Sequence, residues 1–147
     1  VFARNQLTIV VKKGNPKSIK TLADLTTAGT VALCGSDVPC GTYADQILAT
    51  AKVGLPADKI TRGQNVKAAL AAVAEGDADA GIVYVTDVKG DKVEAVAIPD
   101  AQNAIATYPI AVMRASTDQP TMQAFIAYLL SAPGQATLKA AGFLPPG

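Results

Sequence analysis

The sequence predicts an α/β fold in which helices flank a mostly parallel β-sheet. Short β-branched segments alternate with helical ones along the chain, and turns rich in glycine or proline separate them. The segment 80–84 is continuously apolar, which is typical of a strand buried on both faces. The chain has 147 residues, 50% of them hydrophobic, and is therefore long enough to enclose one core.

The first half of the chain predicts three extended segments and two helical ones. The β-branched run 7–12 is a strand that ends at a Gly-Asn-Pro turn, and residues 18–25 form a short helical piece. Residues 30–34 form a short apolar strand. Apolar side chains recur at helical spacing over 41–53, which predicts a helix, and residues 58–61 are extended again.

The second half begins with a helix over 66–74. Asn65 is a good N-cap for this helix, and Gly76 ends it in the left-handed conformation. The later elements follow in order: strands at 80–84 and 92–98, an extended segment at 108–113, and helices over 117–130 and 133–141.

Composition argues against several functions. The net charge of +1 does not suit a nucleic-acid-binding domain, which usually carries a basic patch. No apolar run approaches the roughly 18 residues of a membrane span. The chain has no histidine, so it lacks the commonest general base and metal ligand. Two cysteines alone cannot build a zinc site.

Cys34 and Cys40 bracket a short loop that precedes a helix. A local disulfide fits if their Cα atoms lie within about 7 Å, and two partly buried thiols are an equally good interpretation. A disulfide would imply an oxidising compartment. A free Cys40 thiol at a helix start would have a lowered pKa, but no histidine can act as its base, so we do not expect an enzyme.

Two helix starts and one tyrosine suggest an oxyanion site. Backbone N–H groups at Cys40 and Val66 are unpaired in their helices and lie at the positive end of the helix dipole. Gly41 lets the backbone approach a ligand, and Tyr84 ends a buried strand at the carboxyl edge of the sheet. The alternative is ordinary helix starts and a core tyrosine. For Arg62 we favour a surface role over an arginine fork on the anion.

Five segments in order resemble the periplasmic molybdate-binding proteins of ABC transporters. They are VPCGTY (38–43), NVKAAL (65–70), EGDADAGIVYVTD (75–87), YPIAV (108–112) and AGF (141–143). The resemblance covers nearly the whole chain. It implies a two-lobed, type II solute-binding fold that holds tetrahedral molybdate or tungstate by hydrogen bonds, with no cofactor and no metal cation as ligand.

The resemblance also implies residue roles. Cys40 and Val66 contribute backbone N–H groups, Tyr84 contributes its hydroxyl, and Gly41 and Asn65 support them. The family usually has alanine where Cys40 stands, which is tolerable if only the N–H matters. A disulfide between Cys34 and Cys40 would then either make the loop rigid or twist the N–H away.

Family members are longer at the N-terminus, so the resemblance implies an N-terminally truncated chain. Residues 12–106 correspond to one complete lobe with half of the anion site. Residues 1–11 and 107–147 correspond to interlobe strands and C-terminal helices of a second, incomplete lobe. We expect these helices to pack on the intact lobe, on a second copy, or on a separately encoded fragment, since an unpartnered amphipathic helix exposes apolar surface.

The function that follows is the substrate-binding component of an ABC importer, periplasmic or attached to the cell envelope. Its partners would be the oxyanion and a membrane permease, without nucleic acid. Three alternatives stay open: a ligand-sensing domain of a transcriptional regulator with the same fold, a receptor for sulfate or phosphate, and an interaction module that has lost binding.

Overall fold

The computed structural model describes all 147 residues, which form two compact units. The larger unit is Gln6–Ala104, and the smaller unit combines Val1–Asn5 with Ile105–Gly147. The complete lobe predicted from the sequence is 12–106. The larger unit therefore also includes most of the first strand.

The larger unit is built on a mixed sheet with the strand order β3-β2-β4-β1-β5. Its strands are β1 (Ala3–Lys12), β2 (Val31–Cys34), β3 (Ile60–Gly63), β4 (Ala80–Tyr84) and β5 (Val93–Ala97). Strand β2 pairs in parallel with β3 and β4, whereas β1 pairs antiparallel with β4 and β5. The α/β class is confirmed, and the parallel part of the sheet is the β3-β2-β4 half.

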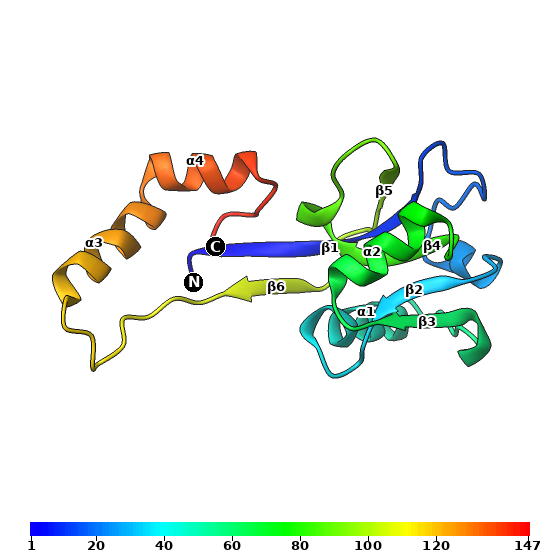
Figure 1. Cartoon of the computed structure of the whole chain (residues 1–147), viewed down its shortest axis with the longest axis horizontal. Coiled ribbons are helices and arrows are strands. Elements are labelled where there is room, and N and C mark those ends of the chain that lie inside the picture. The colour runs from blue at the N-terminus through cyan, green and yellow to red at the C-terminus, as the bar shows by residue number, and fades with distance from the viewer. The chain divides into compact units, whose positions relative to one another are not determined.

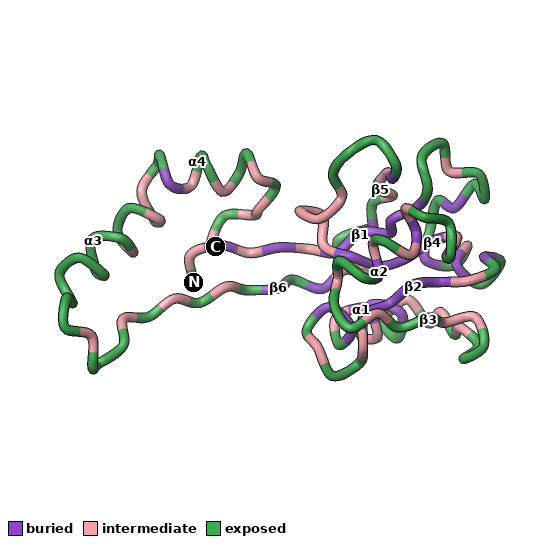
Figure 2. The backbone as a smooth tube through the Cα atoms, in the orientation of Figure 1, coloured by how far each residue is buried: buried purple, intermediate pink, exposed green.

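Helices α1 (Pro39–Thr50) and α2 (Val66–Glu75) cover opposite faces of this sheet (Figure 1). Alternate side chains of each strand enter different clusters: Ile9 packs on the α1 side with Ile47, and Val10 packs on the α2 side with Val73. Both faces are thus covered at the centre of the sheet, which explains why β2, β4 and the second half of β1 are apolar without alternation. Figure 2 shows the buried residues concentrated along β1, β2 and β4.

Local signals explain where α2 begins and ends. The Asn65 side chain accepts a hydrogen bond from the Ala68 N–H at 3.0 Å, as an N-cap does. Gly76 closes the helix at φ +94°, a conformation that favours glycine. The helical piece predicted at 18–25 is shorter in the structure, a single 3-10 turn at Ala23–Thr26.

The smaller unit contains β6 (Ile105–Tyr108), α3 (Gln119–Leu130) and α4 (Ala132–Ala140). Strand β6 pairs with β1, and Arg4 forms an antiparallel bridge with Leu144. The rings of Phe2 and Phe143 both contact Tyr108. The extended segment expected at 108–113 is a strand only up to Tyr108, because Pro109 has no N–H for the ladder.

Most residues of helix α3 are exposed (Figure 2). Its large exposed side chains are Met122, Phe125, Tyr128 and Leu130, and Phe125 is 52% exposed. No helix in the structure has the length and apolar character that crossing a membrane requires.

Candidate functional site

The predicted site residues lie where three parallel strands end. Strand β2 leads into α1, β3 leads into α2, and β4 ends at Tyr84. Cys34 and Gly63 are paired in register at the ends of β2 and β3, so the loops that open α1 and α2 start side by side. Carboxyl ends of parallel strands meet at one edge of a sheet, which is where ligands bind in open α/β folds.

The first turn of α1 leaves one N–H group available. Val38, the N-cap, donates its N–H to the Gly35 carbonyl at 3.2 Å. Pro39 has no N–H, and Gly41 donates to the Val38 carbonyl at 3.0 Å. The Cys40 N–H, between them, has no intrahelical acceptor.

The first turn of α2 offers a second donor in the same manner. Asn65 uses its side chain for the Ala68 N–H, and its carbonyl accepts from the Ala69 N–H at 3.2 Å. The amides of Val66 and Lys67 precede the first intrahelical hydrogen bond. Val66 was predicted from the sequence as a donor and Lys67 was not, although both amides belong to the same turn.

The structure brings Cys40, Val66 and Tyr84 into one apolar cluster. Cys40 is a buried member of this cluster, and the half-buried Val66 and Tyr84 pack against it from α2 and β4. These residues are far apart in the sequence, so their meeting is a result of the fold. All three belong to the larger unit.

Cys34 and Cys40 form a disulfide with a Cα–Cα distance of 5.7 Å, and neither cysteine is free. The sequence left open whether these cysteines form a disulfide or are two partly buried thiols, and the structure has the disulfide. A disulfide sulfur is not a thiolate, so this state also excludes the interpretation of Cys40 as a nucleophile.

Gly41 has a structural role different from the one expected. A Cβ at this position would overlap the carbonyl oxygen of Gly35, and it would lie 2.9 Å from the Cys34 carbonyl oxygen. The absent side chain therefore makes room for the chain's own loop against α1. The expectation was that it makes room for a ligand.

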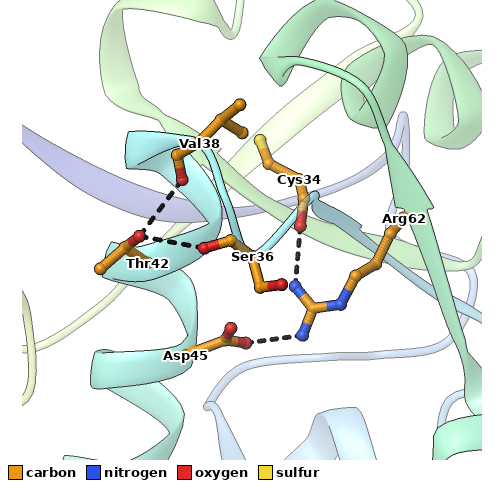
Figure 3. Close-up of polar contacts among 6 residues, drawn as sticks. All are labelled: Cys34, Ser36, Val38, Thr42, Asp45 and Arg62. Carbon is orange, nitrogen blue, oxygen red and sulfur yellow. Dashed lines mark hydrogen bonds and ion pairs between the residues drawn. The ribbon is translucent and has the colours of Figure 1, made fainter.

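Arg62 holds the same loop from β3 (Figure 3). Its Nη1 donates to the Cys34 carbonyl at 2.7 Å, and its Nη2 contacts Asp45 Oδ1 on α1 at 2.8 Å. The guanidinium is thus occupied by protein groups, and its side chain is 34% exposed. Asp45 was missed by the sequence analysis because nothing local links it to Arg62.

The pKa of one acidic side chain, Asp87, is shifted by burial and by nearby charges. Burial raises the pKa of Asp87, which follows β4, while the positive charges of Lys67 and Lys89 and a backbone hydrogen bond from Tyr84 act in the opposite direction. The structure contains no group of three or more His, Cys, Asp or Glu side chains that could hold a metal ion.

Comparison with known proteins identifies the family. The profile of bacterial extracellular solute-binding proteins matches residues 1–144. This chain belongs to that family.

Two relatives of this solute-binding protein are similar over nearly all of it. The molybdate-binding protein ModA of Mycobacterium bovis is 35% identical over 99% of the chain, which spans 56% of that protein. A solved substrate-binding domain from Clostridium difficile, assigned to a molybdenum ABC transporter, is 30% identical with a TM-score of 0.81; the match covers 98% of this chain and 65% of the other.

A third relative is Peb3 from Campylobacter jejuni, which is 25% identical with a TM-score of 0.79. The match covers 97% of this chain and 66% of Peb3. The solute-binding protein described here thus spans just over half the length of its ModA relative and about two thirds of the two solved ones.

Two grooves of this solute-binding protein are lined by residues other than Cys40, Val66 and Tyr84. An apolar groove of about 310 Å³ is lined by residues 110–113 and by Met122, Phe125 and Ile126 of α3. Another, of about 370 Å³, lies in the larger unit beside Lys20, Val53 and Pro99. The candidate site consists of the first turns of α1 and α2 and the end of β4, at one edge of the sheet.

Proposed function

We propose that this solute-binding protein captures molybdate or tungstate for an ABC importer. The observation that carries the proposal is the meeting of two helix starts and Tyr84 at one sheet edge, where the nearby guanidinium of Arg62 is already paired. The anion would be held by the N–H groups of Cys40 and Val66 and by the Tyr84 hydroxyl.

Neutral donors suffice for such a ligand. A hydrogen bond to a charged group contributes about 1.5–3 kcal/mol, roughly twice a neutral one. Each helix start adds a favourable dipole of its own. Because these groups are fixed by the fold, little conformational entropy is lost when the anion binds.

Donor geometry also provides selectivity. Sulfate has shorter bonds to oxygen than molybdate, so a rigid set of donors fits it less well. Phosphate keeps a proton near neutral pH, and a site made only of donors leaves that proton without an acceptor. We therefore expect molybdate and tungstate to be preferred over both.

The relatives support the transport role. The family consists of extracellular solute-binding proteins, and proteins of this kind bind without catalysing a reaction. The names of the M. bovis and C. difficile relatives refer to molybdate or molybdenum. We infer a membrane permease as partner and a location outside the cytoplasm, where a disulfide is stable.

A second surface of the site would come from polypeptide that corresponds to the unmatched part of the relatives. This second surface would add further donors to the anion. Without it, affinity is expected to be much weaker, because part of the donor set is missing and water reaches the ion.

Nuclear magnetic resonance can test the site at its backbone amides. We expect millimolar molybdate, at constant ionic strength, to shift the amide signals of Cys40 and Val66 in the 147-residue chain. Sulfate and phosphate at the same concentration should shift them less. Unmoved signals at both positions would remove the proposed site.

A substitution at Asn65 can change the charge beside the anion without changing the stability of the protein. Asn65→Asp keeps an N-cap but places a negative charge beside the anion, so we expect weaker molybdate binding with an unchanged unfolding midpoint. Asn65→Ser, which caps without charge, is the matched control and should bind as the wild type does. Equal affinity of the two variants would argue against an anion at the start of α2.

A further inference from the structure

Arg62 braces the loop between β2 and α1, and we propose that it is a positioning residue for the anion site. It holds the Cys40 amide in place and does not contact the ligand. This inference rests on the proposed function for its effect on affinity, while its structural part can be tested without ligand.

The guanidinium connects the two sides of the loop. Cys34, whose carbonyl accepts from Nη1 at 2.7 Å, is the last residue of β2 and precedes the loop. Asp45, which accepts from Nη2 at 2.8 Å, lies on α1 beyond the loop. Figure 3 shows one planar group in contact with both residues.

The rest of the loop is held by hydrogen bonds to β3 and α1. The Gly35 N–H donates to the Gly63 carbonyl at 2.8 Å, and the Thr42 hydroxyl is 3.2 Å from the Ser36 carbonyl and 3.4 Å from the Val38 carbonyl (Figure 3). The disulfide closes the same loop covalently. With these groups occupied, the loop is held in its conformation before any ligand arrives.

The ion pair alone cannot explain a role in stability. The side chains of Arg62 and Asp45 are 34% and 41% exposed, and exposed pairs contribute little to the free energy of folding. What the pair provides is geometry, because two nitrogens of one rigid guanidinium each donate to a different acceptor, the Cys34 carbonyl and the Asp45 carboxylate. A lysine would keep the charge but lacks this fixed fork of donors.

Two roles for Arg62 predict opposite effects of removing its partner. If Arg62 positions the loop, Asp45→Ala releases the guanidinium, loosens the loop and weakens molybdate binding. If Arg62 instead contacts the anion, Asp45→Ala frees a positive charge and tightens binding. Arg62→Lys separates the roles further, since a charge contact would survive it and a two-sided brace would not.

The experiment is a molybdate titration of four proteins: the wild type, Asp45→Ala, Arg62→Lys and the control Asp58→Ala. Asp58 is an exposed carboxylate in the 3-10 turn Ala57–Lys59, so the control removes the same charge elsewhere in the larger unit. We expect Asp45→Ala and Arg62→Lys each to raise Kd about tenfold, as loss of a supporting contact does in other ligand sites. The control should leave Kd unchanged. Tighter binding by Asp45→Ala would overturn the proposal.

Hydrogen exchange without ligand tests the positioning role of Arg62 independently of the proposed molybdate binding. The positioning role predicts faster exchange of the Gly35 and Val38 amides in Asp45→Ala than in the wild type or Asp58→Ala, at equal global stability. If millimolar molybdate shifts neither the Cys40 nor the Val66 amide of the wild type, the proposed site is wrong, yet this exchange difference would still support the positioning role of Arg62. Unchanged exchange at both amides would overturn it.

Discussion

The side chain and the backbone N–H of Cys40 have different roles. Its sulfur is bonded to Cys34 inside the cluster on the α2 side, while its N–H lies in the first turn of α1. An alanine at this position, as in the family that the sequence resembles, would provide the same N–H. The disulfide is therefore compatible with the proposed donor, provided that the loop keeps its conformation.

The hydroxyl of Tyr84 is the only side-chain donor in the proposed set. Tyr84→Phe should weaken molybdate binding by about 1.5–3 kcal/mol, because one hydrogen bond to a charged ligand is lost while the ring remains. Calorimetry or the amide titration described above measures the change. Tyr128→Phe, which changes an exposed tyrosine of α3 in the smaller unit, is the control. If Tyr84→Phe keeps full affinity, Tyr84 does not belong to the site.

Asp87 makes the stability of the larger unit depend on pH. Burial raises its pKa above the ordinary value of 3.8, so the folded state binds this proton more tightly than the unfolded state does. The free energy of unfolding should therefore fall as pH rises from below 3.8 through the folded-state pKa. Asp87→Asn should remove this decline and be more favourable, relative to the wild type, at neutral than at acidic pH.

Urea unfolding at acidic and neutral pH measures this difference. Asp91→Asn, which changes an exposed carboxylate in the loop that follows, should show no comparable gain at neutral pH. A wild-type–variant difference that is constant across this range would contradict the assignment to Asp87.

At the scale of elements, local chemistry predicted most of what positions the site. Asn65 indicated the start of α2 because its side chain can cap a helix, and the apolar run 80–84 coincides with β4. Contacts between distant segments left no such signal. The pairing of Arg62 with Asp45 joins β3 to α1, and the place of β1 as an antiparallel strand between β4 and β5 depends on the whole sheet.

The close contact between α1 and its preceding loop depends on Gly41. Gly41→Ala would push a methyl group into the Gly35 carbonyl, and we expect it to cost about 1–3 kcal/mol of stability, as overpacking does. It should also weaken molybdate binding, since the Cys40 amide would move with the loop. Urea unfolding and the amide titration measure the two effects.

Gly54→Ala is the matched control, because a Cβ there meets nothing within 4 Å. It should leave both stability and binding close to wild type. If Gly41→Ala also leaves stability and molybdate affinity unchanged, the loop can move away from the added methyl group without loss of free energy. Arg62 would then hold the loop less firmly than its contacts suggest.

At the scale of the whole molecule, the two units differ in how they bury apolar surface. The larger unit has a sheet covered on both faces, whereas α3 in the smaller unit has no fully buried residue. Contiguous exposed apolar surface usually marks an interaction site. The proposed occupant is the polypeptide that corresponds to the unmatched part of the relatives.

The exposed face of α3 predicts how the 147-residue chain behaves by itself. We expect it to bind an apolar dye and to self-associate through Met122 and Phe125, which are 41% and 52% exposed. Phe125→Ser should weaken association by about 1.5–3 kcal/mol, the value of burying one large apolar side chain, and should lower dye fluorescence. Sedimentation and fluorescence measure both effects.

Val1→Ser, which removes an apolar side chain that is 54% exposed at the N-terminus, is the control. Equal effects of the two substitutions would mean that association does not depend on α3, and the proposed cover for this face would lose its support.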